Sequence, residues 1–85
     1  MKFTYSYGAK RWNKVWVNAY YKKGEVSYNV SIEINIKEKE SKIVWINKRI
    51  NLGKDNFIDS ISKEIDKQLL KESLEYAIEK GYIKE

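Results

Sequence analysis

One segment of this chain carries aromatic and cationic side chains at every second position, and these side chains are its best candidates for binding a ligand. Six residues fall at every second position: Trp12, Lys14, Trp16, Asn18, Tyr20 and Lys22. Because alternate side chains of a β-strand point to opposite faces, a strand here would place all six on one side. Aromatic rings stack on unpaired bases while lysines attract phosphates, so such a face suits binding.

Catalytic residue types are scarce. The chain contains neither His nor Cys, which removes the commonest general acid–base group, the thiol nucleophile and the preferred zinc ligands. Carboxylate pairs at i,i+4 occur at Asp55/Asp59 and Glu75/Glu79. Lysines flank both pairs, as is typical of a solvated helix face. We therefore expect no enzymatic activity, no cofactor and no metal site.

Charge is divided unevenly along the chain. Residues 1–53 carry 11 Lys/Arg and 4 Glu, whereas residues 54–85 carry 6 Lys and 8 Asp/Glu, and the net charge is +5. A basic surface attracts nucleic acid, acidic proteins or anionic membranes. All the cations are Lys except Arg11 and Arg49. Lys acts as a mobile point charge, whereas Arg offers the fork that reads guanine, so we expect nucleic-acid contacts to be mainly electrostatic.

A hairpin is predicted around Lys23-Gly24, because Gly accepts a positive φ in a two-residue turn. It pairs residues 11–22 with 25–36, and Ala19 then opposes Tyr28 while Lys14 opposes Glu33. One face of the pair is apolar throughout, and the other is polar apart from its rings. A slip of one residue would destroy this separation.

A strand on each side extends the sheet. Phe3, Tyr5 and Tyr7 alternate with polar residues, and residues 8–10 are expected to turn the chain into the hairpin. Residues 42–50 form the fourth strand, after a charged loop.

The fourth strand allows two phases. One turns Val44, Ile46 and Ile50 inward, and the other buries Ile43 and Trp45 together with Asn47 and Arg49. Burying an unpaired Arg is costly, which favours the first phase. The complete candidate site then comprises Trp12, Lys14, Trp16, Asn18, Tyr20, Lys22, Trp45 and Arg49.

A helix is predicted over residues 55–81, after a break in the alternation at residues 51–54. Asp55 or Asn56 suits its N-cap, and Gly81 suits the position after its C-cap. Apolar residues recur with helical spacing in two stripes: Ile58, Ile61, Ile65 and Leu69, then Leu70, Leu74, Ala77 and Ile78.

The two stripes raise a packing problem. A helix over 55–80 would be about 39 Å long at 1.5 Å per residue, whereas four strands are only about 19 Å wide. Either the helix bends or splits near Leu70, or the second stripe packs on another subunit and makes a homodimer. Both alternatives remain open at this point.

The sequence thus predicts one α+β domain over residues 1–85. Residues 1–50 form a four-stranded antiparallel β-meander, and the C-terminal helix packs on one of its faces. This arrangement is similar in architecture to double-stranded-RNA-binding domains and to the sheet-type DNA-binding domains of some integrases. The leading helix of the former is missing, and the resemblance covers no contact motif.

The predicted function is that of a small non-enzymatic binding protein whose partner is a nucleic acid. The alternative is an inhibitor encoded by a phage or mobile element, of an anti-CRISPR kind, that occludes a host defence protein. In size and composition the chain resembles such inhibitors. Residues 1–8 lack the apolar core of a signal peptide, and no apolar run approaches the ~20 residues of a membrane span. We therefore expect a cytoplasmic protein, in the host cytoplasm if phage-encoded, without membrane contact.

Overall fold

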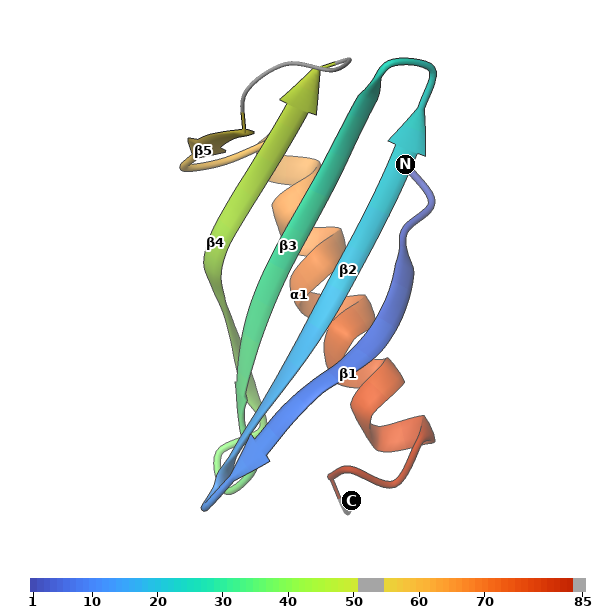
Figure 1. The fold of residues 1–85 in the computed structure, drawn as a ribbon. Coiled ribbons are helices and arrows are strands. Elements are labelled where there is room, and N and C mark those ends of the chain that lie inside the picture. Colours follow the sequence, from blue (N-terminus) through green and yellow to red (C-terminus); the bar gives the residue numbers. More distant parts are fainter. Residues whose placement is uncertain (51–54, 84–85) are drawn as a thin grey trace.

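An antiparallel five-stranded sheet carries one helix on one of its faces (Figure 1). The computed structural model describes residues 1–50 and 55–83. Within them, the elements are β1 (Thr4–Arg11), β2 (Lys14–Lys23), β3 (Val26–Asn35), β4 (Glu40–Ile50), β5 (Asp55–Ile58) and α1 (Lys63–Glu79). The strands lie in sequence order, so the predicted α+β class and antiparallel meander are confirmed, with β5 added at the edge.

The β2–β3 hairpin forms with a register two residues away from the predicted one. Its turn is Gly24-Glu25 and Lys23 pairs with Val26, so Ala19 faces Val30 and not Tyr28. Gly24 has a φ of +62°, which glycine adopts without strain at the first central position of a type II′ turn. A shift of two residues returns every side chain to the same face, so the separation of apolar and polar faces is retained.

A β-bulge at Gly8 replaces the turn that was predicted at residues 8–10. Tyr7 pairs with Val17 and Ala9 with Trp16, which leaves Gly8 as the extra residue. A Cβ at Gly8 would lie 2.8 Å from the Trp16 carbonyl oxygen, so the close approach of the two backbones requires glycine. Strand β1 therefore continues to Arg11.

A second bulge, at Val44, resolves the phase of the fourth strand. Trp45 pairs with Ser31 while Ile43 pairs with Ile32, so one residue of β4 is inserted between the two pairs. Ile43 and Ile46 both face the core as a result. The prediction that Val44 points inward is wrong, since this side chain is 47% exposed. The prediction that Trp45 points outward is confirmed.

The chain between residues 55 and 62 differs from the predicted helix start. Asp55 and Asn56 pair with Arg49 and Lys48 as part of β5, so neither residue is the N-cap. The cap is Ser62, whose side chain accepts a hydrogen bond from the backbone N–H of Ile65 at 3.2 Å. The predicted break at residues 51–54 lies outside the described residues.

Helix α1 runs without interruption through Leu70, so the alternative in which the helix splits there is wrong. Its 17 residues span about 26 Å, because β5 takes the segment that had been assigned to the first turns. The shorter helix packs both stripes on its own sheet. Ala77 is fully buried, and three residues of the second stripe are half-buried against the core: Leu70, Leu74 and Ile78. A dimer through this stripe stays a prediction, and Ala77 is not free to take part in it.

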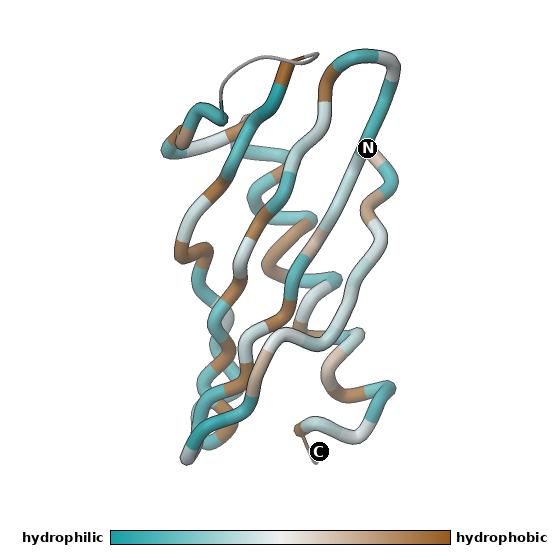
Figure 2. Tube along the Cα trace, in the orientation of Figure 1, coloured by the Kyte–Doolittle hydropathy of each residue, from teal (hydrophilic) through white to brown (hydrophobic). Residues whose placement is uncertain are grey.

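The core fills the space between α1 and the sheet. Apolar residues alternate with polar ones along the strands (Figure 2). The helix contributes Leu69 and Ala77, and Ser73 lies fully buried between them with its hydroxyl donating to the Leu70 carbonyl. The strands contribute Val15, Val17, Ala19, Val30, Ile32, Ile34 and Ile46, and Phe3, just before β1, adds its ring. Within the described residues, the structure has no helix with the length and apolar composition to cross a bilayer.

The chain after α1 returns to the sheet, and Gly81 stands after the C-cap as predicted. Gly81 has a φ of +78°, and the Tyr82 N–H donates to the Ala77 carbonyl at 2.9 Å, as in a Schellman motif. The Tyr82 ring then packs on Tyr7 of β1 with centroids 4.8 Å apart, and Ile83 is buried.

A hydrogen bond joins β1 to the helix on the other side of the core. The Tyr5 hydroxyl donates to Glu72 Oε1 at 2.8 Å, and Gln68 Nε2 donates to the same oxygen at 3.3 Å. Burial raises the pKa of Tyr5 above its ordinary value, and the bond to the Glu72 carboxylate raises it further.

Tyr5→Phe is expected to lower the free energy of unfolding by about 1.5–2 kcal/mol at pH 7, because one hydrogen bond to a charged group is lost. The raised pKa means that this stabilisation is complete below the ordinary tyrosine pKa of about 10 and declines above it. Urea denaturation at pH 7 and at pH 10.5 should therefore show the two proteins converging in alkali. If the free energies of unfolding of the two proteins differ by the same amount at both pH values, this role of Tyr5 is contradicted.

Candidate functional site

Helix α1 covers one side of the sheet and leaves the other, here called the outer face, uncovered (Figure 1). The strand pairings and the burial of the opposite side chains identify its members. They are Thr4, Ser6, Ala9, Arg11, Lys14, Trp16, Asn18, Tyr20, Lys22, Ser27, Asn29, Ser31, Glu33, Asn35, Glu40, Lys42, Trp45, Asn47, Arg49, Asp55 and Phe57.

The structure brings seven of the eight predicted site residues together on the outer face. They are Lys14, Trp16, Asn18, Tyr20, Lys22, Trp45 and Arg49. Trp12 is the exception, because it belongs to the two-residue turn between β1 and β2. Its φ is +60° and its side chain is 87% exposed. The predicted alternation was wrong there, since the strand begins only at Lys14.

The aromatic rings of the outer face come from three strands, β2, β4 and β5. Tyr20 is 45% exposed and Trp45 is 39% exposed, while Trp16 is half-buried. Phe57, at 70% exposed, meets Trp45 edge to face with centroids 6.0 Å apart. Phe57 was not predicted as a site residue, because its segment was assigned to the helix. The signal that was available is the alternation of Asp55 and Phe57 with Asn56 and Ile58.

Amides and hydroxyls fill the middle of the outer face. Asn29 of β3 pairs with Tyr20 on one side and with Asn47 on the other. In the next row, Ser31 pairs with Asn18 and Trp45. The Oδ1 atom of Asn47 is buried and has no hydrogen-bond partner among the described residues. A buried acceptor in this condition is costly, so a ligand that draws the Asn47 amide into the open and gives it a donor would be favourable.

Two ion pairs lie on the outer face. Lys14 Nζ is 3.5 Å from Glu33 Oε1, and Arg49 Nε is 2.8 Å from Asp55 Oδ1. The first pair was predicted, but it runs diagonally, because Trp16 is the residue that pairs with Glu33. Exposed pairs of this kind contribute well under about 1 kcal/mol to stability. The contact with Asp55 nevertheless fixes the direction of the guanidinium group.

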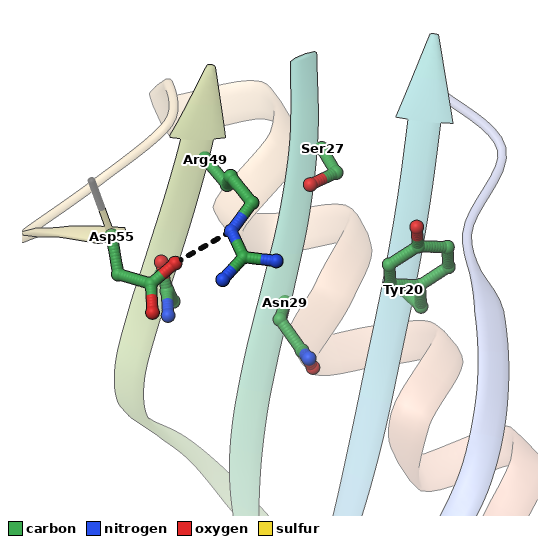
Figure 3. A pocket seen from close by; sticks show the side chains of 6 residues that line it. Tyr20, Ser27, Asn29, Arg49 and Asp55 are labelled. Carbon is green, nitrogen blue, oxygen red and sulfur yellow. Dashed lines mark hydrogen bonds and ion pairs between the residues drawn. The ribbon is translucent and has the colours of Figure 1, made fainter. Parts of the chain in front are cut away.

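A polar hollow of about 260 Å³ lies at the end of the outer face nearest the β2–β3 turn (Figure 3). Its lining comes from four strands: Tyr20, Ser27, Asn29, Asn47, Arg49 and Asp55. Of these, only Tyr20 and Arg49 were predicted as site residues. The other four follow from cross-strand register, since Ser27 pairs with Arg49 and Asn29 with Asn47.

Neither a metal centre nor a known relative identifies the site. Among residues 1–50 and 55–83, no group of three or more carboxylates is placed to hold a metal ion. Comparisons with protein-family models, curated proteins and solved structures find no match for this chain. Its function must therefore be inferred from the geometry of the outer face and its hollow.

Trp12 holds a backbone conformation that is costly for a residue with a Cβ, so relieving it should stabilise the protein. We expect Trp12→Gly to be about 0.5–1 kcal/mol more stable than Trp12→Ala, because both remove the ring and only glycine removes the strain. Thermal unfolding of the two variants measures this difference. Equal stability, or a more stable Ala variant, would show that the turn is not strained at Trp12.

Proposed function

We propose that the outer face binds single-stranded nucleic acid and that the protein acts by binding, without catalysis. The observation that supports this most is the uncovered sheet face itself. Rings with exposed faces stand at its sides and polar groups lie between them. Unpaired bases stack on such rings irrespective of sequence, whereas the bases of a duplex are already stacked on one another.

The position of the rings suits an extended strand. Tyr20 on β2 and Phe57 on β5 belong to the same cross-strand row, separated by Asn29 and Asn47. At about 4.8 Å per strand, the two rings are about 14 Å apart, so they can meet different bases of one strand. Trp45, in contact with Phe57, widens the aromatic surface on that side.

The polar middle of the face favours nucleic acid over a protein partner. The cores of protein–protein interfaces are apolar and depleted of charge. Here the middle consists of amides and hydroxyls: Asn18, Asn29, Ser31 and Asn47. Amide and hydroxyl groups offer the donors and acceptors that base edges need.

The charges supply the attraction to phosphates. Arg11, Lys22 and Lys42 lie on the outer face without a carboxylate partner among the described residues. Lys14 and Arg49 have such partners, but both remain partly exposed. Cations around a polar, aromatic surface track the sugar–phosphate backbone while the rings hold the bases.

A protein target is the second candidate, and Trp12 is the observation that favours it. Its indole projects from the tip of a hairpin, almost fully exposed, in a backbone conformation that costs free energy. Trp is enriched among the residues that dominate protein interfaces. An inhibitor of a host defence protein would use this tip as its anchor. Such a role does not require the polar middle of the outer face.

The nucleic-acid role predicts a steep and face-specific dependence of affinity on salt. For a fluorescent (dT)12 oligonucleotide, Lys22→Gln should reduce the slope of log K against log salt by about 0.7, because one phosphate contact is lost. Lys71→Gln makes the same charge change on the exposed side of α1 and should leave the slope unchanged.

Fluorescence anisotropy over a salt series measures both slopes. The absence of oligonucleotide binding at low salt would contradict the proposal and leave the protein target as the candidate. Equal losses in the two variants would show that binding depends on net charge and not on the outer face.

A further inference from the structure

We propose that the polar hollow on the outer face binds one guanine base of the bound strand and that Arg49 recognises it. This inference rests on the proposed function and adds a base preference to it. Rings alone give little discrimination among bases. The hollow differs from the rest of the face because hydrogen-bonding groups from four strands converge there.

Arg49 is held in an orientation that suits base recognition. Its Nε donates to Asp55 Oδ1 at 2.8 Å, and within residues 1–50 and 55–83 the two terminal Nη groups have no other carboxylate partner and can meet a ligand. Figure 3 shows one of these groups directed over β3, toward the space between Ser27 and Asn29. Two N–H groups of a guanidinium match the O6 and N7 acceptors of guanine, the commonest specific contact of arginine with bases.

Acceptors complete the recognition. Asp55 has a second carboxylate oxygen besides the one bound to Arg49, and Asn47 Oδ1, which lacks a partner among the described residues, becomes an acceptor when its amide turns out into the hollow. A phosphate group offers acceptors only and would leave both oxygens unsatisfied. Guanine offers donors at N1 and N2 as well as its two acceptors, so it suits a site of mixed character.

Adenine fits the same groups less well. It carries an amino donor at C6, where guanine carries its O6 acceptor, so this donor would face the donors of Arg49. When the donors and acceptors of a site match one base, a different base binds less tightly because it leaves some of these groups without hydrogen-bond partners. The hollow should therefore discriminate between the two purines, although their sizes are nearly equal.

The dimensions of the hollow accommodate a planar base. Its volume is about 260 Å³, and its lining on β3 consists of the small or short side chains Ser27 and Asn29. Tyr20 on β2 and Arg49 on β4 are two strands apart, which corresponds to about 10 Å.

The test compares oligonucleotides that differ in one base. Fluorescence anisotropy should give about tenfold tighter binding for (dT)12 with one central dG than for the same strand with dA or dC, as expected from a bidentate contact. Arg49→Lys keeps the charge and removes the fork, so it should reduce this preference to less than twofold. The affinity of this variant for unsubstituted (dT)12 should change much less than its affinity for the strand with dG. Arg11→Lys makes the same chemical change outside the hollow and should keep the preference.

The outcomes separate the two proposals. Equal affinities for all substituted strands, with clear binding of (dT)12, would overturn the guanine site and leave the nucleic-acid role in place. No binding of any strand at low salt would overturn both. A guanine preference that survives Arg49→Lys in a folded variant, as checked by circular dichroism, would overturn the assignment of recognition to Arg49.

Discussion

The packing of one helix against one side of the sheet is the constraint on which the rest of the structure depends. Helix α1 buries Leu69, Ser73 and Ala77 against the sheet, and the small side chains of Ser73 and Ala77 permit a close approach. A single helix has only one sheet face to cover, so the alternate residues of every strand remain on the other side. Apart from Ala9, those residues are polar, charged or aromatic, and they make up the outer face. The core and the candidate binding surface therefore arise from the same period-two alternation.

Two β-bulges adjust this alternation where a regular strand would fail. The inserted residue at Val44 lets Ile43 and Ile46 both reach the core, although they are three residues apart, and it directs Trp45 outward. The bulge at Gly8 lets Tyr5 and Tyr7 face the helix, while Arg11, further along β1, pairs with Lys14 on the outer face. Without the insertion at Val44, β4 would have to expose Ile43, or else expose Ile46 and bury Arg49.

The sequence predicts those parts of the structure that depend on local periodicity. The outer face of β2 and β3 was predictable because a register error of two residues leaves the faces unchanged. The end of α1 was predictable because Gly81 marks it chemically. The bulges and β5 were not, since one inserted residue or a four-residue strand carries little periodic signal and Ile58 also fits a helical stripe. The hollow depends on cross-strand neighbours such as Ser27 and Arg49, so it requires the correct register before it can be seen.

The central claim is that the uncovered sheet face, and not the helix or the hairpin tip, contacts the ligand. The most direct measurement is a ¹H–¹⁵N NMR titration of the protein with (dT)12 at low salt. We expect the indole N–H signals of Trp16 and Trp45 and the side-chain amide signals of Asn29 and Asn47 to shift, while the backbone signals of α1 around Ser73 stay in place. Shifts confined to α1 or to the Trp12 indole would contradict the claim, as would a spectrum that does not change.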